Sequence, residues 1–154
     1  MSVYLDHYLA VLSRIETGLG KALVAVGRHH PADAGVAHVC ARMARECDDH
    51  ARSIDAFARR HLRDASGGVE HAGAAAFAGP HGGGIGLLRD LHALYLLAAD
   101  CEISWTIADR AAQAAGDAEL AEVVARCRAE TSGQVAWLRA RIREVAGAAV
   151  AGGG

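Results

Sequence analysis

The chain has 154 residues, of which 52% are hydrophobic and 22% are charged, and its formal net charge at neutral pH is −2. This length and composition predict one compact domain, and the near-neutral charge argues against binding to nucleic acid or anionic membranes through overall electrostatics. No apolar run reaches the roughly 18 residues that a membrane span needs. Because no basic leader precedes Asp6 either, we expect a cytoplasmic protein.

Hydrophobic residues recur at intervals of three and four positions, which predicts amphipathic helices and no strands. The four blocks that show this pattern are residues 2–28, 34–63, 85–115 and 117–146. Gly27, Pro31 and Asp33 mark the first joint, and Gly116 followed by Asp117 marks the last. Both joints are short, so each predicts an antiparallel helical hairpin.

A long segment rich in glycine and alanine, residues 64–84, separates the second and third blocks. A linker of this length inside a compact domain is expected where the chain must travel the length of a bundle before the next hairpin begins. The predicted fold is therefore all-α, with two antiparallel hairpins joined by a long crossover in a single domain of residues 1–146. Residues 147–154 are expected to form a flexible C-terminal tail.

Each predicted helix carries polar residues on its otherwise apolar face. They are Glu16 in the first helix, Glu46 and His50 in the second, Glu102 in the third, and Glu130 and Gln134 in the fourth. One of these residues on each helix lies near the helix midpoint, so we expect them to meet at one level of the bundle. Carboxylates gathered in a low-dielectric interior repel one another, so such a layer implies bound metal, protonation or displacement toward the surface.

The order of these residues resembles the ferritin-like di-iron carboxylate family, in which two helices supply one Glu each and two supply a Glu with a nearby His or Gln. The resemblance covers the four helices. It implies that Glu46 and Glu130 bridge two metal ions and that Glu16 and Glu102 are terminal ligands. The implied cofactor is iron or possibly manganese, and the implied chemistry is oxidation of Fe(II) with O₂ or peroxide.

The two paired helices depart from the pattern of that family. His50 follows Glu46 by four residues rather than by the usual three, and Gln134 follows Glu130 by the same four. The resemblance implies that His50 binds one ion. Gln134 stands where a second histidine is expected, and because an amide is a weak ligand, the second ion would be held loosely.

Two other interpretations use the same core. In the first, Glu16, His50, Glu102 and Glu130 form a metal-free hydrogen-bond network in a non-catalytic bundle that acts as an oligomeric binding or assembly module. The second concerns sulfur, because a stripe of Cys40, Met43, Cys47 and Cys127 could hold Cu(I). Reduced cysteines that simply fill the core are the alternative to that copper site.

The third predicted helix has a second apolar stripe on its back, formed by Leu96, Ile103 and Ile107. A chain this small has little protein left to cover that face. Val69 and Phe77 are the large apolar residues of the linker that could do so. Otherwise the stripe is expected to pair with its own copy, which predicts a homodimer through the third helix.

Overall fold

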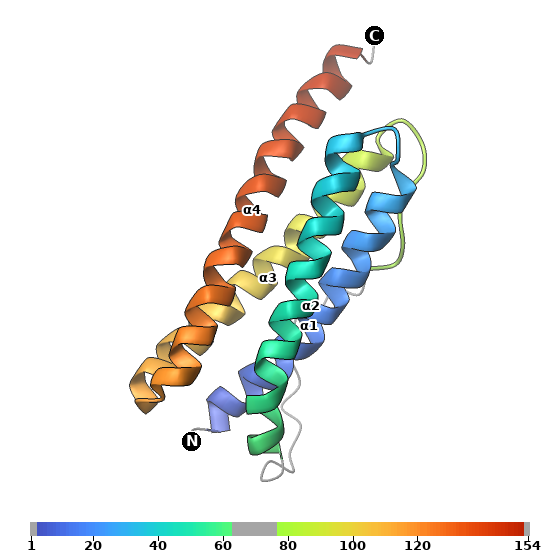
Figure 1. Cartoon of the computed structure of the whole chain (residues 1–154). Coiled ribbons are helices and arrows are strands. Elements are labelled where there is room, and N and C mark those ends of the chain that lie inside the picture. Colours follow the sequence, from blue (N-terminus) through green and yellow to red (C-terminus); the bar gives the residue numbers. More distant parts are fainter. Residues whose placement is uncertain (1–2, 63–76, 153–154) are drawn as a thin grey trace.

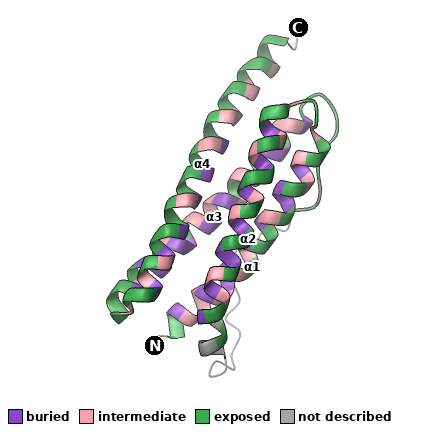
Figure 2. Cartoon of the chain, in the orientation of Figure 1, coloured by how far each residue is buried: buried purple, intermediate pink, exposed green. Residues whose placement is uncertain are grey.

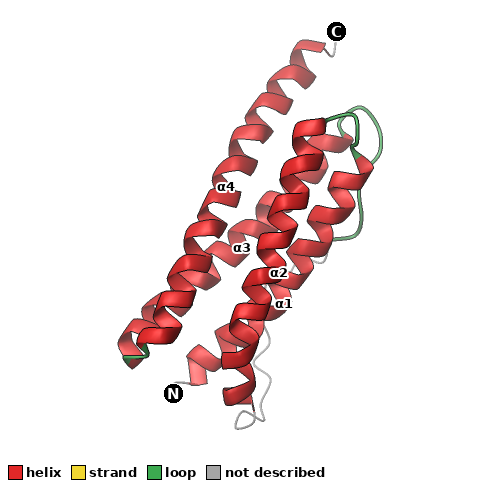
Figure 3. Cartoon of the chain, in the orientation of Figure 1, coloured by secondary structure: helices red, strands yellow, loops and turns green. Residues whose placement is uncertain are grey.

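The structure is a computed structural model that describes residues 3–62 and 77–152, and this part of the chain contains four α-helices and no strand (Figures 1 and 3). The helices are α1 (Val3–His29), α2 (Ala34–Leu62), α3 (Gly86–Ala115) and α4 (Ala118–Gly152). The all-α prediction is thus confirmed for the described residues. Every helix end lies within one residue of its expected position, except for the end of α4.

The helix α4 continues to Gly152, so its predicted end at residue 146 was wrong. Gly147 favours an early stop, because glycine has low helix propensity. The residues that follow it are mostly alanine, the best helix former, and they extend the helix by more than a turn. In Figures 1 and 2 this last part of α4 projects beyond the other helices, and most of its residues are exposed.

The two predicted helix joints have the local structure expected of them. Asp33 Oδ1 accepts the backbone N–H of Val36 at 3.0 Å, which caps the start of α2. Asp117 Oδ1 accepts the N–H of Leu120 at 3.1 Å and caps α4 in the same way. Gly116 ends α3 in the left-handed conformation, with φ of 69°, which glycine adopts without the steric cost that a Cβ would bring.

Contacts at one end of the bundle define the directions of the helices. His30, just after α1, contacts Asp90 near the start of α3. Asp33, just before α2, contacts Arg141 in the later part of α4. The helices α2 and α3 therefore start at the same end and run in the same direction (Figure 1). Residues 63–76 lie outside the described residues, so the crossover along the outside of the bundle stays a prediction.

The four helices share one apolar core, which appears as the inward-facing buried residues in Figure 2. The helix α1 packs against α2 and α3, while α4 packs closely against α3 and more loosely against α2. The largest fully buried side chains include Leu12, Met43, Leu94, Trp105 and Leu138. None of the described helices combines the length and the apolar character that crossing a bilayer requires.

The back of α3 carries the predicted second apolar stripe at the surface. Leu96, Ile103 and Ile107 are 53%, 56% and 37% exposed. Phe77 packs against the main core, and Val69 lies outside the described residues. We refer to Leu96, Ile103 and Ile107 below as the α3 stripe.

Candidate functional site: a buried charged layer

Side chains from all four helices meet in the interior of the bundle. Glu16 of α1 and His50 of α2 are both 0% exposed. His50 Nδ1 lies 3.3 Å from Glu16 Oε1, and His50 Nε2 lies 2.8 Å from Glu130 Oε2 of α4. Trp105 of α3 donates its indole N–H to Glu16 Oε1 at 2.6 Å. We call Glu16, His50, Trp105 and Glu130 the charged layer.

The position of His50 between two carboxylates indicates that its imidazole ring is protonated. A neutral imidazole has a single N–H and can donate to one carboxylate, whereas an imidazolium donates to both. Burial by itself would lower the pKa of His50, but the hydrogen bonds and negative charges of Glu16 and Glu130 outweigh it and raise this pKa. His50 thus supplies a positive charge at the centre of the charged layer.

At the edge of the layer, Glu130 also faces a second cation. Its Oε1 lies 3.7 Å from Nη1 of Arg126, which is one turn earlier in α4. The same guanidinium nitrogen lies 2.8 Å from Asp49 Oδ2 of α2. The carboxylates of the layer are therefore compensated by protein cations, His50 in the interior and Arg126 at the surface.

Gln134 and Glu46 form a separate pair beside the charged layer. The buried Gln134 amide donates to Glu46 Oε1 at 3.3 Å, and its Oε1 lies 4.0 Å from the Cys47 thiol. Gln134 thus acts as a hydrogen-bond donor to the glutamate that the family resemblance assigns as a bridging ligand. Burial, reinforced by the negative charge of Glu16, raises the pKa of the Cys47 thiol.

Glu102 does not join the charged layer, contrary to the expectation that it would meet the other inward polar groups. It is partly exposed, and its charge acts on Arg139 of α4. Buried residues such as Leu94, Ala98 and Trp105 mark the inward face of α3, and Glu102 lies at the flank of that face. Tyr95, seven residues before Glu102, points the same way and is also only partly buried. Counting Tyr95 with the inward face brings the expected centre of that face closer to Glu102. Trp105 makes the contact from α3 instead.

The polar atoms of the layer bond to one another and do not form a ready ligand set for two metal ions. Among the described residues, no group of three or more His, Cys, Asp or Glu side chains has the arrangement needed to hold a metal ion. Both nitrogens of His50 contact carboxylates, and Glu46 is held by Gln134. One atom stands apart: Glu16 Oε2 is buried and has no hydrogen-bond partner.

The four cysteines are free and buried, as expected for core thiols. Burial raises the pKa of Cys40 to about 11 and that of Cys127 to about 12. The burial of these thiols in the shared apolar core fits the interpretation of the sulfur stripe as core packing. The copper site stays a prediction.

A second buried carboxylate, which the sequence analysis missed, lies at the end of the bundle. Asp90 is 0% exposed, and its Oδ1 accepts both the backbone N–H of His81, at 2.8 Å, and the His81 ring Nδ1, at 2.7 Å. Its Oδ2 lies 2.7 Å from His30 Nε2. Burial opposes the charge of Asp90, but these hydrogen bonds outweigh it and lower its pKa. The available signal was the position of Asp90 on the inward face of α3, one turn before Leu94.

A glycine lets the chain fold closely around this carboxylate. A Cβ added at Gly86 would lie 2.4 Å from the His81 carbonyl oxygen, a distance at which backbone must move. Because only glycine fits there, residues 81–86 can turn back on the start of α3 and bring the His81 ring to Asp90. Asp90 thereby connects the segment before α3 to the joint between α1 and α2.

Comparisons of the chain with protein-family models, with curated proteins and with solved structures found no match. The class of the protein therefore rests on the fold and the site alone. The described residues form an all-α four-helix bundle with a buried, hydrogen-bonded charged layer. The ferritin-like family stays a resemblance drawn from the order of residues along the chain.

Proposed function

We propose that this protein is a non-catalytic helical-bundle module for binding and assembly, in which the charged layer aligns the helices. The observation that carries the proposal is the engagement of both His50 nitrogens by Glu16 and Glu130. An acid–base catalyst needs a nitrogen within hydrogen-bond reach of its substrate. Here both nitrogens are committed to the protein, so the layer is suited to structure.

A charged layer of this kind favours one alignment of the helices over others. If α2 slid along α1 or α4 by one turn, His50 would lose Glu16 and Glu130, and a buried charge would be left without its partner. Apolar contacts tolerate such shifts more readily, because they are not directional. The layer thus sets the relative heights of α1, α2 and α4, which a module that presents a defined surface requires.

The surface that we propose for assembly is the α3 stripe, through which two copies form a homodimer. Its three large apolar side chains are exposed along one side of a helix whose other side is buried. Exposed apolar patches of this kind are typical of interaction sites. Pairing of α3 with the α3 of a second copy buries the stripe in a closed two-fold arrangement.

Replacing Ile103 with glutamate is expected to convert the dimer into a folded monomer, because two buried carboxylates would face each other across the two-fold axis. Sedimentation velocity measures the mass, and circular dichroism checks that the helices remain. Val150→Glu is the matched control, since Val150 is 83% exposed on α4 and lies away from the stripe. An Ile103→Glu protein that keeps the dimer mass would assign the interface to another surface.

A second candidate function is the ferritin-like di-iron centre that the resemblance implies. Support for it comes from the gathering of Glu16, His50 and Glu130 in one layer, with Glu46 and Gln134 beside it, and from the unpartnered Glu16 Oε2. His50 would have to release its carboxylates for metal to bind. Bound iron, or manganese, would supply oxidase or peroxide-reducing chemistry.

Metal analysis of protein purified without chelator, followed by an anaerobic Fe(II) titration, separates the two functions. If the protein is an assembly module, we expect no saturable binding of Fe(II). The Glu46→Ala and Asp49→Ala proteins should then give the same result in the titration. A di-metal site would instead take up roughly two ions per chain. Loss of that uptake in Glu46→Ala, with uptake retained in Asp49→Ala, would establish the ferritin-like function in place of the module.

We also propose a cytoplasmic location. The four free, buried cysteines support it, because disulfides are rare in reducing compartments. None of the described cysteines pairs with another, although Cys40, Cys47, Cys101 and Cys127 all lie in the same core.

A further inference from the structure

The charged layer leaves one strong hydrogen-bond acceptor unused. Glu16 Oε1 accepts from Trp105 and contacts His50, but the buried Oε2 has no partner. The neighbouring Thr17 hydroxyl donates to the Ser13 carbonyl at 2.8 Å and is not directed to it. An unsatisfied buried carboxylate oxygen is costly, so a donor that reaches it would bind favourably.

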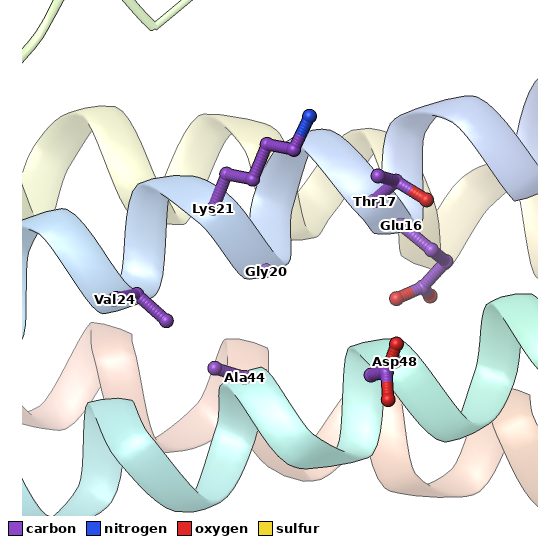
Figure 4. A pocket seen from close by; sticks show the side chains of 7 residues that line it. All are labelled: Glu16, Thr17, Gly20, Lys21, Val24, Ala44 and Asp48. Carbon is purple, nitrogen blue, oxygen red and sulfur yellow. The ribbon is translucent and has the colours of Figure 1, made fainter.

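A groove between α1 and α2 leads to this carboxylate. It has a volume of about 360 Å³, and Glu16, Gly20, Val24, Ala44 and Asp48 are among the residues that line it. Figure 4 shows the Glu16 carboxylate turned from α1 toward α2, with Asp48 on the facing helix. Gly20 lines the groove without a side chain, and a Cβ there would come into van der Waals contact with Cys47 Cβ of α2, at 3.4 Å.

The two ends of the groove differ in chemistry. At one end, two carboxylates, Glu16 and Asp48, face the space from opposite helices (Figure 4). Asp48 also contacts Arg52 at 3.0 Å, but both side chains are strongly exposed, and such a surface pair is weak. At the other end, Val24 and Ala44 form an apolar wall. Lys21 also lines the groove, and Figure 4 shows its ammonium group on the side of α1 that faces away from α2.

We propose that this groove binds a small primary alkylamine, with its ammonium group between Glu16 and Asp48 and its alkyl chain against Val24 and Ala44. An ammonium group has three donors and no acceptor, which suits the unpartnered Glu16 Oε2 and the exposed Asp48 carboxylate. The apolar wall favours an alkyl chain over a bare ion. The site goes beyond the proposed assembly function, because it uses the oxygen that the layer leaves free.

The probe that tests the proposal is n-butylammonium, titrated into the full-length protein and followed by ¹H–¹⁵N NMR. We expect saturable shifts of the Gly20, Val24 and Ala44 amides, and none with n-butanol, which has the same length but no charge. Ala44→Leu fills the groove without changing any charged group, and it should abolish these shifts. Glu16→Gln should abolish them too, but because it also alters the layer, Ala44→Leu is the decisive variant.

The charged end is tested by a matched pair of variants. Asp48→Asn should weaken butylammonium binding about tenfold, since a charge-assisted hydrogen bond is lost. Asp49→Asn should leave it unchanged, because Asp49 faces Arg126 on the other side of α2. Equal binding of butanol, binding retained by Ala44→Leu, or equal effects of the two Asp variants would each overturn the proposal. Tighter binding of N-acetyl-lysine methylamide than of butylammonium would also overturn it, in favour of a lysine from a partner protein.

Discussion

Replacing His50 with leucine is expected to lower the free energy of unfolding by about 3–5 kcal/mol, the cost typical of removing one partner from a buried ion pair. Leucine is close to histidine in volume, so the cavity contribution is small. The main loss is electrostatic: Glu16, 0% exposed, keeps the Trp105 hydrogen bond but loses its cation. Urea denaturation of the wild-type and His50→Leu proteins measures the difference.

A double-mutant cycle tests that the loss comes from the charge pair. In the His50→Leu background, Glu16→Gln removes the isolated buried charge, so part of the lost stability should return. In the wild-type background, the same change should be destabilising, because it leaves the imidazolium with one carboxylate fewer. Simple additivity of the two single-variant losses would show that His50 and Glu16 do not interact.

The pH dependence of stability provides a second readout of the same residue. The pKa of His50 is raised in the folded protein, and that of an unfolded histidine is about 6.5. A raised folded-state pKa contributes stability that is fully present below about pH 6.5 and is lost as the pH rises through the folded-state pKa. The free energy of unfolding of the wild-type protein should therefore decrease between about pH 6 and about pH 8. This window lies below the pH range in which the cysteines of the unfolded chain ionise. His50→Leu should remove this slope; an unchanged slope would assign it to other groups.

Replacing Asp90 with alanine is expected to lower the free energy of unfolding by about 2–4 kcal/mol, because partly buried donors would lose a charged acceptor. The losses include the part-buried hydrogen bonds of the His81 backbone N–H, the His81 ring and the His30 ring. Denaturation in urea measures the total effect. Amide exchange should become faster at residues 81–86, which Asp90 connects to the rest of the bundle.

Asp90→Asn is the control for this prediction, since it keeps the shape and one acceptor oxygen and should cost less than Asp90→Ala. The indole N–H signal of Trp105 reports on the charged layer and should not change, because the layer and Asp90 share no described contact. If exchange at residues 81–86 stayed slow in Asp90→Ala, the segment would be held by contacts other than this carboxylate.

The amino-acid sequence by itself determined the four helices, their joints and the inward placement of several polar groups. Helix periodicity, the Asp33 and Asp117 caps and the left-handed Gly116 depend on residues a few positions apart, so local pattern is enough to predict them. The same periodicity was enough to place Glu16 and His50 inside the bundle. It did not give the end of α4, where the favourable propensity of alanine outweighed a single glycine.

The tertiary structure decided which inward groups meet. A helical wheel gives the direction of a side chain but neither the identity nor the distance of the residue it faces, because these depend on how far each helix is rotated and shifted against its neighbours. That packing brought Trp105 rather than Glu102 to Glu16, made Gln134 a donor to Glu46, and placed His50 between two carboxylates. It also joined Asp90 to histidines nine and sixty positions away, a contact that only the folded chain creates.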